Sequence, residues 1–92
     1  MLSVFRTKAY RKAIKKYSGS GNFNIEKVES VIKTIQKGEK LDKKYRNHDL
    51  TGKYRGIMEC HIKPDLLLLY KIEKENLILI LLNLGSHSDL FG

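Results

Sequence analysis

The chain has 92 residues, of which 41% are hydrophobic and 30% are charged. These values are typical of one globular domain with a small core, and they exclude a disordered chain. Eighteen Lys and Arg against ten Asp and Glu give a net charge of +8. Such a charge favours polyanions, namely nucleic acid, an anionic membrane surface or an acidic protein, and for so small a chain we place nucleic acid first.

The only cysteine, Cys60, excludes an internal disulfide and fits a reducing compartment. It lies in an alternating apolar run, so we expect a buried thiol, with a catalytic cysteine as the alternative. The N-terminal residues, MLSVFRTKAY, lack the apolar core and the cleavage site of a signal peptide. The longest apolar runs, residues 66–70 and 77–82, are too short to span a membrane. We therefore expect a cytoplasmic protein without a membrane segment.

The first half of the chain predicts a short strand followed by two amphipathic helices. Residues 2–6 form the strand, and Thr7 is a good N-cap for a helix that begins directly after it. The segment 18–21, with the sequence SGSG, ends this helix. Asn24 caps a second helix, which carries an apolar stripe and ends near Gly38.

The second half of the chain predicts an antiparallel meander. The polar segment 39–52 reads as an extended loop that ends in a turn. Residues 53–62 alternate as a strand does, and Lys63-Pro64-Asp65 supplies turn chemistry. Residues 66–72 form a nearly continuous apolar strand, typical of the middle of a sheet, and residues 77–84 form the last strand.

This order of elements predicts a single α+β domain over residues 1–92. An N-terminal strand and a two-helix hairpin should pack on an antiparallel sheet. Because the helices cover one face of that sheet, the other face is free to line a concave surface.

Basic residues cluster in two places. The first 16 residues hold six basic residues and no acid. Residues 37–55 hold three acids and seven basic residues, which are Lys37, Lys40, Lys43, Lys44, Arg46, Lys53 and Arg55. Clustered cations of this kind neutralise phosphates. Since the second cluster borders two of the histidines, we expect RNA contacts from Lys44, Arg46, Lys53 and Arg55.

The three histidines, His48, His61 and His87, all lie at predicted ends of elements, where sites are usually built. Asp65 stands in the turn that follows the strand of His61. Each histidine by itself reads as an ordinary surface or core residue. Together with Asp65 they resemble the acid and base groups of a catalytic set.

RNA cleavage needs such groups. A base removes the proton of the ribose 2′-OH, which attacks the adjacent phosphate, and an acid protonates the departing 5′ oxygen. Histidine suits either role because its pKa of ~6.5 lies near the working pH. Arg55 offers a planar cation for the phosphate charge that grows in the transition state.

Zinc is the alternative use of these histidines. Their spacings of 13 and 26 residues include no HxH or HExxH pattern. Cys60 and His61 are adjacent on a strand, so their side chains face opposite sides. We therefore expect neither a metal nor another cofactor.

Three segments resemble the motifs of YafQ-type toxins of the RelE superfamily, in the same order and spacing. NHDLTGKYRG at 47–56 is similar to D-H-x-L-x-G, ECHIKPDLLLLYKI at 59–72 to H-x-x-P-D-x-x-L-x-Y, and LGSHSDLFG at 84–92 to G-(S/T)-H-x-x-L-F. Asn47 replaces the usual Asp, and Leu66 stands where some members have an aromatic residue.

The resemblance implies a RelE-like fold and a toxin of a type II toxin–antitoxin pair that cuts messenger RNA in the ribosomal decoding site. It places active-site residues at His48, His61, Asp65, His87 and Phe91, with Phe91 able to stack on a base. It also implies a cognate antitoxin as protein partner. Two alternatives stay open: a non-catalytic RNA- or ribosome-binding module, and a subunit that only binds its antitoxin in a repressor complex.

Overall fold

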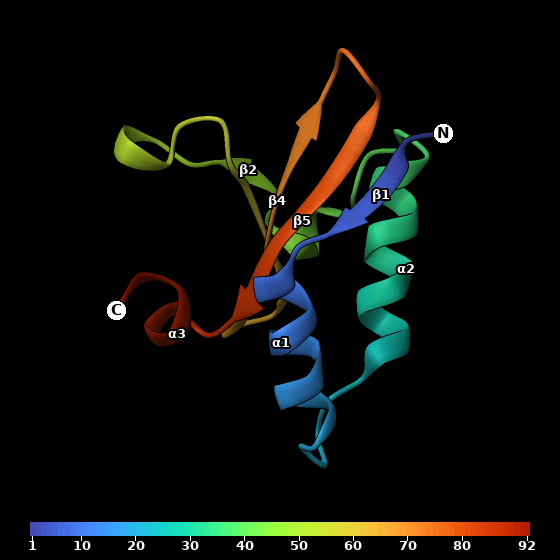
Figure 1. Cartoon of the computed structure of the whole chain (residues 1–92). Helices are drawn as coiled ribbons and strands as arrows, with labels where there is room; N and C mark the ends of the chain where they lie inside the picture. Colours follow the sequence, from blue (N-terminus) through green and yellow to red (C-terminus); the bar gives the residue numbers. More distant parts are fainter.

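The framework of the molecule is a five-stranded sheet with helices against it, and the computed structural model describes residues 1–92. In chain order the elements are β1 (Ser3–Arg6), α1 (Lys8–Ser18), α2 (Ile25–Gln36), the 3₁₀ turn η1 (Lys43–Tyr45), β2 (His48–Asp49), the 3₁₀ turn η2 (Gly52–Tyr54), β3 (Met58–Lys63), β4 (Leu66–Glu73), β5 (Ile78–Gly85) and α3 (His87–Phe91). The strands are ordered β1-β5-β4-β3-β2. In Figure 1, α1 and α2 lie together on one side of the sheet, and α3 lies apart from them, beyond the end of β5.

Both long helices begin at the predicted caps. The Thr7 side chain accepts a hydrogen bond from the backbone N–H of Tyr10, and Asn24 does the same for Lys27. Each cap satisfies one of the N–H groups that the first turn leaves without a partner. The Thr7 hydroxyl also lies 2.8 Å from the carbonyl oxygen of Leu81, which ties the start of α1 to β5.

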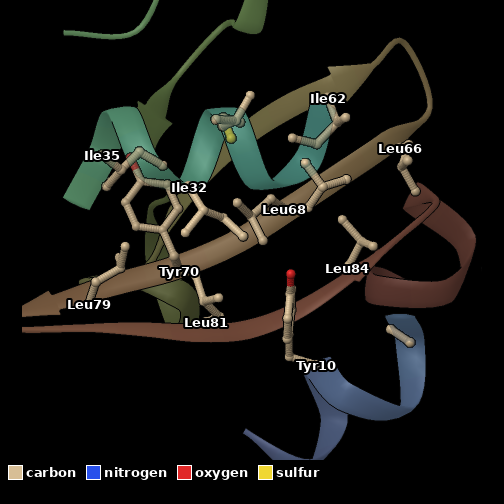
Figure 2. Packing of buried hydrophobic residues seen from close by; sticks show 14 of the residues in the cluster. Tyr10, Ile32, Ile35, Ile62, Leu66, Leu68, Tyr70, Leu79, Leu81 and Leu84 are labelled. Carbon is tan, nitrogen blue, oxygen red and sulfur yellow. The ribbon is translucent and has the colours of Figure 1, made fainter. Parts of the chain in front are cut away.

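The core lies between the sheet and the pair α1 and α2. In Figure 2, side chains from β3, β4 and β5 point toward Tyr10 of α1 and toward Ile32 and Ile35 of α2. Leu68 and Leu81 are fully buried in this layer. Burying one such side chain contributes about 1.5–3 kcal/mol to the free energy of unfolding. The predicted α+β fold, with helices on one sheet face, is confirmed.

The sheet is mixed, because β1 differs from the other strands in direction. The predicted antiparallel meander is present as β3-β4-β5, but β1 pairs with β5 in parallel, from Ser3 opposite Ile78 onward. A parallel pair needs a long crossover connection, which the intervening helices and strands supply. Gln36 at the end of α2 holds the entry to β1, since its side-chain amide donates to the carbonyl of Leu2 at 2.8 Å.

A β-bulge in β5 decides which of its side chains face the helices. Pairing with β4 continues on either side of Leu82 but leaves Leu82 itself without a partner. The extra residue shifts the alternation of the strand by one. Leu79 and Leu81 face the core before the bulge and Leu84 faces it afterwards. Gly85 therefore lies on the opposite face, directly before α3.

Two parts of the prediction were wrong in detail. The strand expected from residue 53 begins at Met58, because Gly52 and Gly56 adopt positive φ angles of 65° and 90° and form a turn instead. The C-terminal tail after the last predicted strand, for which no helix was predicted, forms α3 with Ser86 as its N-cap. No helix of the protein has the length and apolar character that a membrane crossing requires.

Candidate active site

The three histidines converge on the sheet face opposite α1 and α2. In the strand register, His48 of β2 lies opposite Glu59 of β3. His61 of β3 lies opposite Leu67 of β4, and Leu67 lies opposite the last residue of β5. The helix α3, which begins with His87, follows soon after. The register of four strands thus brings together residues that are far apart in the sequence.

The three imidazole rings form a row with His61 in the middle. The ring centroids of His48 and His61 are 6.2 Å apart, and those of His61 and His87 are 6.0 Å apart. The outer two side chains are 49% and 58% exposed, whereas that of His61 is 11% exposed. Two accessible imidazoles therefore flank one that is nearly buried.

Glu59 joins two members of the row. Its carboxylate oxygen Oε1 lies 3.3 Å from Nε2 of His48 and 3.4 Å from Nε2 of His61. The Glu59 side chain is 6% exposed, and no other charged residue of the chain is buried. We had not predicted Glu59 as a site residue. The signal was present, because an acid at this position of an apolar strand shares a face with His61 two residues later.

A strained turn holds His48 in place. Arg46 adopts the left-handed conformation with φ 49°, which is uncommon for a residue with a side chain. Its carbonyl oxygen lies 2.7 Å from Nδ1 of His48. Asn47 accepts a hydrogen bond from the Tyr70 hydroxyl at 2.6 Å, which fixes the turn to the sheet. The amide oxygen of Asn47 therefore anchors the turn to Tyr70. Asn47 stands at the position where the D-H-x-L-x-G motif has Asp.

Asp65 orients His87. One carboxylate oxygen of Asp65 lies 3.1 Å from both the backbone N–H and the ring Nδ1 of His87. The hydrogen bond from the backbone N–H, followed by the one from the ring, holds the pKa of Asp65 below its ordinary value. The carboxylate therefore favours a proton on Nδ1, which leaves Nε2 of His87 as the nitrogen available to a substrate.

A second carboxylate holds the whole of α3. Asp89 accepts a hydrogen bond from the Tyr17 hydroxyl at 2.5 Å and pairs with Lys16 at 3.3 Å. These two contacts lower the pKa of Asp89, with the tyrosine as the larger cause. A Cβ at Gly85 would lie 3.0 Å from the Asp89 side chain, so a larger residue there would have to push α3 outward by a few tenths of an ångström.

Phe91 packs outside the core, at the end of the histidine row. Its ring lies 6.3 Å from the ring of His87 and meets the edge of Tyr54 at 5.2 Å. Tyr54 was not predicted as a site residue. Its turn also carries Lys53, whose ammonium group lies 5.2 Å from the Tyr54 ring, and Arg55, which is exposed. Through Tyr54, Lys53 borders the row on this side, and Arg55 is the second cation of the same turn.

Two residues singled out in the sequence lie elsewhere. Cys60 is fully buried in the core, which confirms the predicted buried thiol. Burial raises its pKa to about 12, so the thiol stays protonated and the alternative of a catalytic cysteine is not supported. Leu66 is 7% exposed and also belongs to the core. A side chain packed there does not reach the row to stack on a base.

A family model that matches nearly the whole chain shows which family the chain belongs to. A model described as a bacterial toxin of type II toxin–antitoxin systems, YafQ, matches residues 2–92. The chain belongs to the YafQ family. This result confirms the resemblance drawn from the three motifs.

Individual relatives and solved structures agree with this assignment. The mRNA interferase toxin YafQ of Escherichia coli K12 is 35% identical over 48 residues, which cover 52% of this chain and about half, 50%, of that relative. The crystal structure of a metal-bound toxin from Helicobacter pylori is 38% identical and has a TM-score of 0.93, covering 99% of this chain and 100% of that one. The E. coli DinJ–YafQ complex is 22% identical with a TM-score of 0.87 over 100% of both chains, which shows a shared fold.

The Helicobacter toxin was crystallised with a bound metal, so we ask whether the side chains of this chain could hold one. No group of three or more His, Cys, Asp or Glu side chains is arranged here to hold a metal ion. The Nε2 atoms of His48 and His61 are both directed at the Glu59 carboxylate instead. These residues do not fit a resident metal, and we derive no chemical step through one.

Proposed function

We propose that this chain cuts messenger RNA on the ribosome by acid/base catalysis without a metal ion, as the toxin of a type II toxin–antitoxin pair. Three histidines that converge on one sheet face, two of them sharing the Glu59 carboxylate, support this activity most directly. The E. coli relative is an mRNA interferase toxin, which supports the same substrate.

The proposed reaction is a transesterification within the RNA. The 2′ oxygen attacks the adjacent phosphorus, the bond from phosphorus to the 5′ oxygen breaks, and one proton moves to a base while another comes from an acid. The products are a 2′,3′-cyclic phosphate and a 5′-hydroxyl. This chemistry needs two proton-transfer groups, a base on one side of the phosphate and an acid on the other.

His87 is the residue that we assign to direct proton transfer at one side. It is the most exposed of the three histidines, and Asp65 fixes its tautomer so that Nε2 faces outward. His48 is the accessible imidazole at the other end of the row, with Glu59 and Arg46 holding its two nitrogens. We propose that a phosphodiester laid across His61 meets these two groups.

The residues around the row supply the other requirements of the reaction. Arg55 and Lys53 bring positive charge to the phosphate, which favours the charged transition state. Phe91, supported by Tyr54, offers a face for base stacking, worth about 1–3 kcal/mol for a single-stranded base. Lys44 and Arg46 lie on the other side of His61, where they extend the positive surface.

A protein partner is part of the proposal. The YafQ family is defined by toxin–antitoxin systems, and E. coli YafQ has been solved with DinJ. We propose that this chain binds its own antitoxin and that the antitoxin blocks access to the row. We propose a cytoplasmic location, because the proposed substrate is messenger RNA on the ribosome.

Primer extension on a message in a translating extract tests the proposed activity. We expect cuts within codons by the natural chain and a loss of about 10²–10⁴-fold in their rate for His87→Ala, the range that one general acid or base contributes. The His87→Ala protein should still bind ribosomes. If the natural chain makes no cuts at high concentration, the proposal is wrong. Equal arrest of translation by both proteins would favour a non-catalytic binding module.

A further inference from the structure

A basic groove lies beside the histidine row, at the free edge of β3. The short strand β2 pairs with β3 only at Met58 and Glu59, so the edge beyond them, residues 60–63, has no strand partner on that side. A cavity of about 240 Å³ occupies this edge, between η1 and the first turn of α2. Its lining includes Lys27, Lys44, Tyr45, Arg46, His61 and Lys63.

The groove concentrates positive charge without a counter-ion. Four of its lining side chains are Lys or Arg, and none is Asp or Glu. None of the ion pairs of the chain includes one of these four cations. The ammonium groups of Lys27 and Lys44 lie 6.0 Å and 5.3 Å from the ring of Tyr45, so cations from α2 and from η1 both border this ring. Like charges that converge in this way repel one another unless an anion joins them.

His61 connects the groove to the histidine row. Its ring lines the cavity, and its Nε2 lies 3.4 Å from the carboxylate of Glu59. Its other nitrogen, Nδ1, is buried and has no hydrogen-bond partner in the protein. Because Nδ1 is buried, a strand in the groove would meet the exposed part of the His61 ring and not this atom. Arg46 also belongs to both regions, because its backbone carbonyl holds His48.

We propose that this groove binds the phosphodiester backbone of single-stranded RNA, at nucleotides adjoining the one that is cut. This inference rests on the proposed function, since it takes the histidine row as the place of cleavage. Lys27, Lys44, Arg46 and Lys63 neutralise the phosphates, and the strand then passes over His61 into the row. Lys27 and Lys63 thereby join the RNA contacts expected from the sequence.

The lining favours RNA over an acidic protein segment. Two of the eight lining residues are hydrophobic. The side-chain stems give the walls of the groove more apolar than polar surface, but four of its eight lining residues carry a positive charge. Only Ile62 and Pro64 have the wholly apolar side chains that could anchor the apolar centre that a docked protein segment buries. A nucleic acid backbone gains its affinity from charge neutralisation and needs no apolar anchor.

The test measures binding of a ten-nucleotide, fully 2′-O-methylated RNA by fluorescence anisotropy, so that no 2′-OH is available for cleavage. The groove variant is Lys27→Ala/Lys44→Ala, and the control is Lys8→Ala/Lys15→Ala on α1, which removes the same charge. We expect the groove variant to lose about tenfold in affinity. The slope of log K against log salt should fall by about 1.4, since each neutralised phosphate of a single strand contributes about 0.7. The control should stay within about twofold of the natural chain, because its lysines lie outside the groove.

Three results separate the possible failures. Equal RNA affinity of the groove variant and the control overturns the groove assignment. Unchanged RNA binding together with lost binding of a decaglutamate peptide overturns it in favour of an acidic protein partner. Cleavage in the translating extract reports on the proposed function separately. A natural chain that binds RNA through the groove but makes no cuts removes the proposed function and leaves the groove as an RNA-binding site.

Discussion

The histidines of this chain take different roles because their immediate partners differ. His87 has an exposed ring with one nitrogen held by Asp65, and His48 has both nitrogens directed at oxygen atoms. The sequence predicted all three histidines and Asp65 as candidates, since each stands beside the end of an element. Glu59 was missed, because a single acid on a strand normally indicates a solvent-facing side chain. Its burial depends on contacts from β2 that no local pattern reveals.

At the residue scale, Glu59→Gln tests whether the shared carboxylate matters for the reaction. The amide keeps the shape but loses the charge that faces two imidazoles, and hydrogen bonds to charged groups are worth about 1.5–3 kcal/mol. We expect cleavage at neutral pH to fall about tenfold or more. The midpoint of thermal unfolding should change little, because a neutral amide avoids the cost of burying a carboxylate.

Glu75→Gln is the matched control for this change, since Glu75 is exposed in the β4–β5 turn and forms no ion pair. Equal activity of both variants would show that Glu59 has no part in catalysis. A large drop in the unfolding midpoint of Glu59→Gln alone would assign it a structural role instead.

At the scale of elements, α3 is the part of the fold that the sequence described least well. The motif that contains His87 was recognisable, but a five-residue helix is too short to give a periodic pattern. Its position depends on Asp89 and Tyr17, which are 72 residues apart in the sequence. The bulge at Leu82, which turns Gly85 toward the site face, was equally invisible to a pattern of simple alternation.

Asp89→Asn and Tyr17→Phe should each release α3 from α1 and reduce cleavage several-fold. Global stability should change little, because α3 contributes no residue to the core cluster. Backbone amide exchange of residues 87–91 measures the release directly. Both changes act on the hydrogen bond between the two side chains, so the double variant should lose less than the sum of the single losses, although Tyr17→Phe also removes the bond from the Ser86 N–H and Asp89→Asn the ion pair with Lys16. Additive losses would mean that the two side chains act separately.

The carboxylates of Asp65 and Asp89 also predict an effect of acid on α3. Their pKa values in the folded chain are lowered from 3.8 by hydrogen bonds, chiefly from the His87 backbone and from Tyr17 respectively. A lowered pKa contributes stability that is present above the ordinary value and is lost as pH falls through the folded value. NMR of residues 87–91 should therefore show α3 unchanged from neutral pH down to about 3.8 and increasingly mobile as the pH falls from there through the lowered pKa values of the folded chain. Release of α3 near neutral pH would contradict this assignment.

At the scale of the whole molecule, one hydrophobic layer supports the site. The helices cover a single sheet face, as the segregation of helices and strands in the sequence predicted, and the histidines lie on the other face. The direction of β1 was not predictable, because the residues of an edge strand carry no signal for parallel or antiparallel pairing. The basic groove depends on η1 and α2 meeting at the edge of β3, which is again a tertiary feature.

Leu68→Ala tests this division between core and site. Leu68 is fully buried in the centre of β4 on the helix side, so its truncation should cost about 2–5 kcal/mol of unfolding free energy. Domains of this kind have about 5–15 kcal/mol in total, so the folded fraction at 25 °C should remain high. Chemical denaturation measures the loss, and activity per folded molecule should stay close to that of the natural chain. A loss below about 1 kcal/mol would mean that the layer is not packed as described.

The chemistry of the cut ends tests the central claim most directly. Mass spectrometry of fragments from a translating extract identifies the groups on both sides of each cut. Attack by the 2′ oxygen, with proton transfer by His87 at one side, predicts a 2′,3′-cyclic phosphate and a 5′-hydroxyl at every cut, and loss of these fragments with His87→Ala. Fragments ending in a 3′-hydroxyl and a 5′-phosphate, or the same fragments from His87→Ala at the same rate, would contradict it.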